Sequence, residues 1–171
     1  MTNFLNPSEI LKQLNLRKNM IAADFGSGSG GWVIPLAKIL EDGHVFAVDI
    51  LEEPLSALRS KAKLEKLSNI DAIKADVEKG TSLLADSCDL VLMTNLLFQA
   101  ENKFGILAEG RRVLKSGGEI LVVDWKPESP LGPKEGRVST EEVKNLANNV
   151  NLKLEQEFSA GNYHYALVFK K

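Results

Sequence analysis

The sequence predicts one doubly wound α/β domain, in which a mostly parallel sheet carries helices on both faces. Short apolar runs alternate along the chain with segments whose apolar residues recur at helical spacing. The runs themselves are almost continuously apolar, which is typical of strands buried on both faces. Two further runs near the carboxyl end are joined by residues 159–162, a connection short enough for an antiparallel hairpin.

The elements of the first half each have a local reason. Asn6 can cap a short helix in which Pro7 takes the first position. Apolar strands are expected at 20–25, 44–50 and 70–74, and the first two end in an acidic residue and its neighbour. Between them, residues 30–40 and 52–66 carry apolar stripes at helical spacing, and Pro54 is tolerated because it falls in a first turn.

The second half continues the alternation. Strands are expected at 88–93 and 120–124, with a helix at 101–114 between them that turns Phe104 and Leu107 inward. Ser139 and Glu142 have the spacing of a capping box, so another helix should begin there. The closing hairpin should pair strands at 152–158 and 163–169.

Composition narrows the function. The chain has 171 residues, 44% apolar and 26% charged, which fits a single domain over 1–171. Its formal net charge of −2 argues against nucleic acid as the main partner. One cysteine, Cys88, excludes an internal disulfide, and two histidines make a metal site unexpected. The sequence has neither a membrane-spanning run nor a signal peptide, so a cytoplasmic protein is expected.

Polar side chains follow five successive strands. They are Asp24, Asp49, Asp76, Asn95 and Asp124. Ligands of open parallel sheets bind at the carboxyl ends of the strands, which is where these residues should gather. A single acid in such a place can simply cap a helix, but five polar residues in series favour a binding site.

A glycine loop, DFGSGSGG, joins the first strand to the following helix. Gly26, Gly28 and Gly31 match the dinucleotide pattern G-x-G-x-x-G, whereas Asp24 with the alternate glycines matches an acid-x-G-x-G-x-G pattern. A tight turn without a ligand stays open as the structural alternative. A carboxylate beside the loop would repel a pyrophosphate, so Asp24 favours an adenosine ligand that carries a positive charge.

These motifs together resemble the class I S-adenosylmethionine-dependent methyltransferases, of the kind grouped as methyltransferase domain types 11 and 25. The resemblance rests on DFGSGSGG, AVDI, ADVEKG and GRRVLKSGGEILVVDW and covers nearly the whole chain. It implies a Rossmann-like seven-stranded sheet of order 3-2-1-4-5-7-6. It also implies a minimal substrate lid, since residues 1–18 supply only a short helix.

The resemblance implies a role for each matching residue. Asp24 and the backbone of Gly26, Ser27, Gly28 and Gly30 would hold the methionine part of S-adenosylmethionine, and Asp49 would hold the ribose hydroxyls. Ile50 would lie against the adenine, Asp76 would accept from its amino group with Val77 nearby, and Asn95 would face the methionine end. Asp76 as a helix cap and Asn95 as a turn residue stay open as alternatives.

The acceptor side is expected at one rim of the sheet. If the last strand lies beside the fifth, Trp125, Tyr163 and His164 share that rim, and Phe98 lies near it. His164 is the candidate general base, with a packing role as the alternative.

The expected function is methyl transfer to a small or medium-sized molecule. A non-catalytic or regulatory cofactor-binding subunit and, less favoured, an NAD-dependent oxidoreductase are the alternatives. A homodimer is left open.

Overall fold

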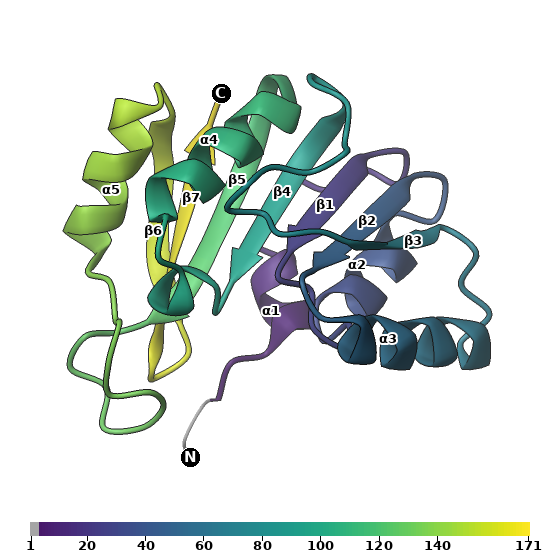
Figure 1. Cartoon of the computed structure of the whole chain (residues 1–171), viewed down its shortest axis with the longest axis horizontal. Helices are drawn as coiled ribbons and strands as arrows, with labels where there is room; N and C mark the ends of the chain where they lie inside the picture. Colours follow the sequence, from purple (N-terminus) through teal and green to yellow (C-terminus); the bar gives the residue numbers. More distant parts are fainter. Residues whose placement is uncertain (1–3) are drawn as a thin grey trace.

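A computed structural model of the chain, which describes residues 4–171, has the predicted architecture (Figure 1). The described residues form a seven-stranded sheet of order β3-β2-β1-β4-β5-β7-β6, parallel except for β7. The strands are β1 (Ile21–Phe25), β2 (His44–Asp49), β3 (Ile70–Lys74), β4 (Cys88–Thr94), β5 (Leu114–Trp125), β6 (Lys153–Ala160) and β7 (His164–Lys170). The predicted fold class and strand order are confirmed.

The helices divide between the two faces of the sheet. They are α1 (Pro7–Leu11), α2 (Val33–Ile39), α3 (Glu52–Leu64), α4 (Lys103–Val113) and α5 (Thr140–Asn149), with a 3₁₀ turn, η1 (Leu97–Gln99). Helices α1 and α2 and Leu58 of α3 share one core cluster, and α4 and α5 share the other (Figure 1). No helix between residues 4 and 171 is long and apolar enough to cross a bilayer.

The two predicted caps are present. The side chain of Asn6 accepts hydrogen bonds from the backbone N–H groups of Ser8 (3.1 Å) and Glu9 (3.4 Å). The hydroxyl of Ser139 accepts from the backbone N–H of Glu142 at 3.2 Å. These bonds satisfy donors that have no partner within a first helical turn, so the sequence alone locates both helix starts.

Several boundaries and one orientation differ from the prediction. Helix α2 begins at Val33 rather than at residue 30, and β5 begins at Leu114, with a register shift opposite Cys88 and Leu90. Phe104 is 47% exposed, so its predicted inward orientation is wrong. The buried stripe of α4 instead contains Ile106, Leu107, Gly110 and Val113, and Phe104 lies on the opposite side of the helix.

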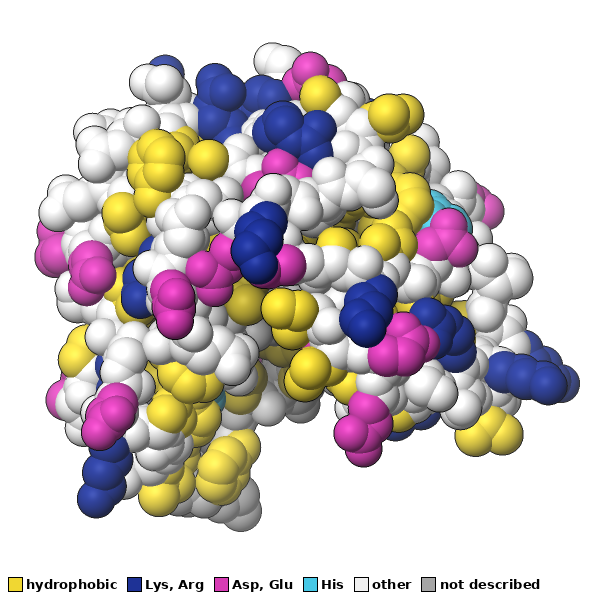
Figure 2. Space-filling model, in the orientation of Figure 1, with side chains coloured by type: hydrophobic (Ala, Val, Ile, Leu, Met, Phe, Trp, Pro, Cys, Tyr) yellow, Lys and Arg dark blue, Asp and Glu magenta, His cyan; other side chains and the backbone are white. Residues whose placement is uncertain are grey.

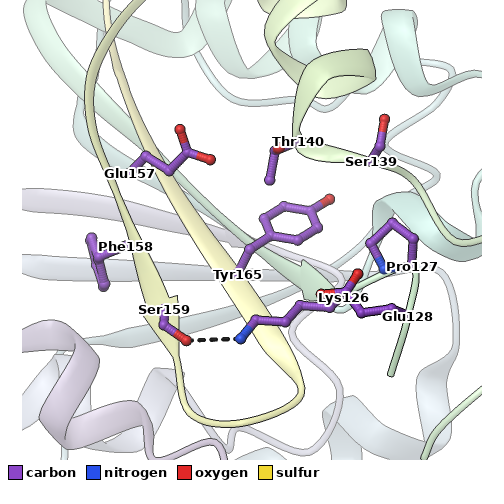
Figure 3. Close-up of a pocket in the computed structure, with 9 residues that line it drawn as sticks. All are labelled: Lys126, Pro127, Glu128, Ser139, Thr140, Glu157, Phe158, Ser159 and Tyr165. Carbon is purple, nitrogen blue, oxygen red and sulfur yellow. Dashed lines mark hydrogen bonds between the residues drawn. The ribbon is translucent and has the colours of Figure 1, made fainter. Parts of the chain in front are cut away.

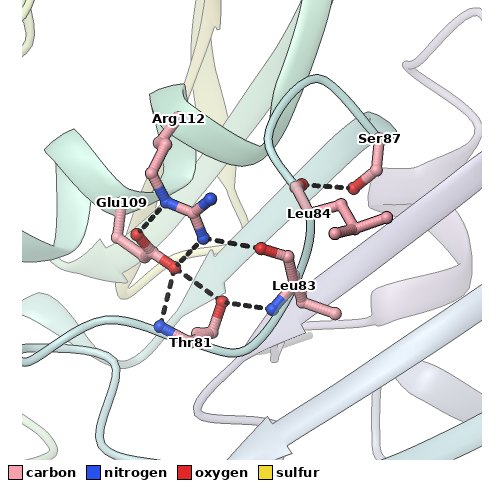
Figure 4. Close-up of polar contacts among 6 residues, drawn as sticks. All are labelled: Thr81, Leu83, Leu84, Ser87, Glu109 and Arg112. Carbon is pink, nitrogen blue, oxygen red and sulfur yellow. Dashed lines mark hydrogen bonds and ion pairs between the residues drawn. The ribbon is translucent and has the colours of Figure 1, made fainter.

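The connection from β3 to β4 differs from the others because residues 75–87 contain no α-helix. A cluster of polar contacts fixes this loop to α4 (Figure 4). One oxygen of Glu109 accepts from the backbone N–H and hydroxyl of Thr81, at 2.7 and 2.6 Å. Arg112 donates to both oxygens of Glu109 and to the carbonyl of Leu83, at 2.7 to 2.8 Å. The loop therefore has a defined path without a helix of its own.

Candidate functional site

A cavity of about 390 Å³ opens at the carboxyl ends of β1, β2 and β3. Six of the residues that the sequence predicted to bind a cofactor line it: Gly26, Gly28, Asp49, Ile50, Asp76 and Val77. The volume lies within the roughly 300–1,000 Å³ of small-molecule sites. The remaining predicted cofactor residues, Asp24, Ser27, Gly30 and Asn95, lie outside this lining.

A larger cavity of about 470 Å³ lies beside β6 and β7 (Figure 3). Tyr165 lies in its middle and donates a hydrogen bond to the carbonyl of Val138 at 2.9 Å. Lys126 spans its floor and donates to the hydroxyl of Ser159, also at 2.9 Å. None of the predicted site residues lines this cavity, so size alone does not locate the candidate site.

The glycine loop has the geometry of a ligand cradle. The backbone N–H groups of Gly26 and Ser27 donate to the carbonyl of Val48, at 2.8 and 3.0 Å, which anchors the loop to β2. Gly28 has a φ of +52°, and a Cβ at this position would meet nothing within 4 Å. The loop is therefore both strained for other residues and open to the cavity, which lets a ligand approach the backbone closely.

Asp24 is a buried charge without a partner. Its side chain is fully buried, and neither oxygen meets a hydrogen-bond partner among residues 4–171. Burial, with a smaller contribution from the nearby carboxylate of Asp49, raises the pKa of Asp24 to about 8. An unpaired buried carboxylate is costly, and such groups occur chiefly where a function requires them.

Asp49 lies between the glycine loop and the segment after β2. One of its oxygens accepts from the backbone N–H of Gly28 at 2.8 Å, and the other accepts from that of Leu51 at 3.0 Å. These two bonds fix the orientation of the carboxylate. Because an ionised carboxylate has about four acceptor positions, two remain for a ligand's hydroxyl groups.

Asp76 and Val77 continue the cavity wall after β3. Asp76 accepts from the backbone N–H of Glu78 at 3.1 Å and pairs with Nζ of Lys79 at 2.8 Å, and the bond from Lys79 lowers its pKa. It is therefore a turn residue, as the structural alternative required, and it lines the cavity as well. Val77 is buried, while Ile50 across the cavity is 56% exposed.

Asn95 follows β4 in a left-handed backbone conformation, with a φ of +50°. Its backbone N–H donates to the carbonyl of Val123 at 2.8 Å, and its own carbonyl accepts from Nε2 of Gln99 at 3.0 Å. The side-chain Oδ1 is buried without a partner among the described residues. Asn95 thus acts as a turn residue that also keeps a free acceptor near the edge of the sheet.

Apolar residues after β4 complete the cavity and were missed by the sequence analysis. Leu96 and Ala100 line it together with Gln99. Leu96 also contacts the glycine loop, because a Cβ on Gly26 would come within 2.9 Å of its side chain. Their only sequence signal is their place after a predicted strand, which does not distinguish a cavity wall from a core residue.

The predicted acceptor rim assembles around Trp125. The residue pairs with His164 across β5 and β7, and their ring centroids lie 4.0 Å apart. A Cβ on Gly132, in the loop after β5, would come within 2.5 Å of the same indole, so the loop packs against it. Tyr163 precedes His164 and contacts Phe4, with ring centroids 5.5 Å apart.

Phe98 is held beside this rim from two sides. Its backbone N–H donates to the carboxylate of Asp124 at 3.2 Å, and a Cβ on Gly136 would collide with its carbonyl oxygen. The four predicted acceptor residues lie outside the lining of the 390 Å³ cavity. Their role toward a substrate stays a prediction.

Arg137 organises the loop after β5. Its guanidinium donates to the carbonyls of Pro133 (2.6 Å), Ser129 (2.6 Å), Leu131 (2.7 Å) and Pro127 (2.9 Å). One side chain thus collects four turns of backbone, which gives this loop a defined shape over Trp125 and Phe98.

His164 is almost fully buried, with 3% of its surface exposed. Burial, aided by the positive charge of Lys126, lowers its pKa to about 4. The imidazole is therefore neutral at pH 7. A base whose conjugate acid has so low a pKa accepts protons weakly, which favours the packing alternative.

We expect His164 to make the protein less stable in mild acid. Its pKa is about 4 when folded and 6.5 ordinarily, so between these pH values the unfolded chain binds more protons and stability falls as the pH falls. The loss should be about 2–3 kcal/mol by pH 4. Urea denaturation at pH 7 and 4.5 measures it, and His164→Phe should reduce the difference while His44→Phe should not. Equal differences in the wild type and His164→Phe would refute this assignment.

The fold and the site together define an α/β domain built to hold a nucleoside at the carboxyl edge of its sheet. Residues 16–170 match the methyltransferase domain family, and the chain belongs to this family. The predicted resemblance is therefore confirmed.

Individual relatives agree with this assignment. The chain is similar to a demethylmenaquinone methyltransferase of Listeria welshimeri, with 29% identity over 68% of this chain and 49% of that protein. It is similar to a ubiquinone/menaquinone biosynthesis C-methyltransferase of Marinomonas, with 28% identity over 71% of this chain and 49% of that protein. It thus spans about half the length of these curated relatives. A SAM-dependent methyltransferase from Aquifex aeolicus superimposes with a TM-score of 0.89 and 25% identity, over 96% of this chain and 89% of that one.

Proposed function

We propose that the protein binds S-adenosylmethionine and transfers its methyl group to a small or medium-sized acceptor molecule. The observation that carries the proposal is the buried, unpartnered carboxylate of Asp24 beside the glycine loop. A ligand with an ammonium group would satisfy it, whereas the phosphates of a dinucleotide would be repelled. The names of the curated relatives add a quinone-like ring as one acceptor class.

The lining residues fit the cofactor's adenosine half. Asp49, fixed by the N–H groups of Gly28 and Leu51, would accept from the ribose hydroxyls. Ile50 and Val77 offer apolar contact for the adenine ring, and Asp76 offers an acceptor for its amino group. When bound, the cofactor supplies a methyl group that is already activated for displacement.

The protein's own part is then mainly alignment. Holding two reactants in register can lower a barrier by roughly 7–11 kcal/mol without a catalytic base. The absence of an accessible base near the cavity among the described residues is therefore compatible with the proposed activity. The loop held by Arg137, with Phe98 and Trp125 beneath it, is the proposed contact surface for the acceptor.

Calorimetric titration tests the proposal. The protein should bind S-adenosylmethionine and its product S-adenosylhomocysteine, and should bind NAD⁺ weakly or not at all. Binding of NAD⁺ without S-adenosylmethionine would instead identify the oxidoreductase alternative. Incubation with labelled donor and cell extract should then yield a methylated small molecule. Tight cofactor binding without any product across saturating acceptor screens would favour the non-catalytic subunit.

Replacement of Asp49 by alanine should weaken cofactor binding. Loss of charge-assisted hydrogen bonds costs about 1–3 kcal/mol, which corresponds to roughly a 5- to 150-fold higher Kd. Asp71→Ala is the matched control, because Asp71 begins the neighbouring strand β3 at the opposite end of the sheet. Calorimetry on both variants decides the matter: an unchanged Kd in a folded Asp49→Ala protein would remove the ribose assignment.

A further inference from the structure

The helices leave one part of the sheet uncovered. On the face that carries α4 and α5, no helix lies over β1, β2 and β3, since the β3–β4 connection forms only a loop (Figure 1). Hydrophobic side chains gather on this part of the surface in Figure 2. Sheet faces of this kind are normally buried by a packed layer.

This face contains a hollow and a projection side by side. The hollow, of about 340 Å³, lies over Ile21, Phe46 and Ile73 and is bordered by Leu83 and Leu84. Leu83 is buried, but Leu84 next to it is 77% exposed. We call Ile21, Phe46, Ile73 and Leu84 the β3–β4 patch.

The loop that presents Leu84 is held firmly. Arg112 donates to the carbonyl of Leu83 at 2.8 Å, and the hydroxyl of Ser87 donates to the carbonyl of Leu84 at 2.7 Å (Figure 4). The backbone N–H groups of Asp86 and Ser87 donate to the end of α4, at 3.1 and 2.9 Å. An exposed leucine on a fixed loop loses little conformational entropy when it docks, so the patch is preorganised for binding.

The charge at the patch favours a near-neutral partner. Asp86, the acidic residue of the loop, is already paired with Nζ of Lys171 at 2.7 Å. The whole chain carries a formal net charge of only −2, so two copies repel each other weakly. A twofold interface also requires that one patch hold both a projection and its receptor, which the adjacent Leu84 and hollow provide.

We propose that the β3–β4 patch is the interface of a symmetric homodimer, in which Leu84 of each copy enters the hollow of the other. The interface lies away from the glycine loop and the proposed cofactor cavity. It therefore stands independently of the proposed function, and dimerisation should not depend on cofactor.

Sedimentation velocity over a concentration series tests the proposal. The wild type should shift from one to two times the monomer mass as concentration rises. Leu84→Asp should raise the dissociation constant at least about tenfold, because it would bury a charge in an apolar contact. Ser82→Arg, an exposed polar position at the edge of the same hollow, should do likewise without touching the core. Leu64→Asp is the matched control, since Leu64 is 82% exposed at the end of α3, outside the patch.

Three outcomes would overturn the proposal. One is a wild type that stays monomeric up to several hundred micromolar. Another is a dimer that persists unchanged in both Leu84→Asp and Ser82→Arg. The third is a dimer that Leu64→Asp disrupts as strongly as Leu84→Asp does. Far-ultraviolet circular dichroism of each variant establishes that the comparison is made between folded proteins.

Discussion

Replacement of Asp24 by asparagine should abolish most cofactor binding and at the same time stabilise the free protein. The carboxylate is fully buried and has no hydrogen-bond partner among residues 4–171, so its ionisation is a cost that only a bound cation offsets. Removing one member of a buried charge pair costs about 2–5 kcal/mol of binding, or at least roughly a 30-fold rise in Kd.

The stabilisation should grow with pH. The pKa of Asp24 is about 8 when folded and 3.8 ordinarily, so the folded state binds more protons between these values. Wild-type stability should therefore fall as the pH rises from 4 to 8, and the variant should lack this slope. At pH 8.5 the gain should reach about 1–3 kcal/mol, measured by urea denaturation without ligand.

Asp124→Asn is the matched control for that experiment. Asp124 also ends a strand and is fully buried, and burial raises its pKa to about 6. Unlike Asp24, it accepts hydrogen bonds from the backbone N–H groups of Trp125 (2.8 Å) and Phe98 (3.2 Å). An amide cannot accept both through two oxygens, so this variant should lose stability. A loss of stability in Asp24→Asn equal to that in Asp124→Asn would contradict the account of Asp24.

Replacement of Glu109 by alanine should have the largest effect on folding. Glu109 is 8% exposed and joins α4 to the β3–β4 loop through Thr81 and Arg112 (Figure 4). Its removal leaves the guanidinium and the Thr81 N–H without their acceptor. Since the Arg112 side chain is 40% exposed, water recovers part of the loss, and we expect about 2–3 kcal/mol of destabilisation.

The pH dependence of the same group provides a second measurement. Burial alone would raise the pKa of Glu109, but the hydrogen bonds from Arg112 and Thr81 outweigh it and lower the pKa to about 2. The stability that Glu109 contributes should therefore be complete above pH 4.5 and disappear as the pH falls toward 2. Urea denaturation of the wild type and Glu109→Ala should converge over that window. A difference below 0.5 kcal/mol at pH 7, a threshold typical of neutral surface changes, would show that the contacts carry no stability.

Much of the fold could be predicted because its signals are local. Uninterrupted apolar runs mark the parallel strands, and Asn6 and Ser139 mark helix starts by side-chain capping. The early start of β5 could not be predicted, since it depends on a turn at Gly117 (φ +78°) and a register shift against β4. The orientation of Phe104 depends on which side of α4 meets the sheet, and Gly110, packed against Met93, decides that.

The candidate site divides in the same way. The glycine loop and the acids after the strands could be found from residue type and spacing. The isolation of Asp24, the two N–H groups that orient Asp49 and the cavity wall from Leu96 depend on contacts between distant segments, which no local pattern records. His164 shows the opposite limit, because its residue type indicated a base while its cross-strand neighbours bury it.

The most direct test of the account is the number of protons released when S-adenosylhomocysteine binds. Calorimetric titration at pH 7 in two buffers of different ionisation enthalpy measures this number. Because Asp24 is largely protonated at pH 7 and must ionise to pair with the ligand's ammonium group, the wild type should release nearly one proton and Asp24→Asn nearly none. Binding by the wild type without proton release, at an affinity that Asp24→Asn retains, would contradict the assignment of Asp24 as the cation site.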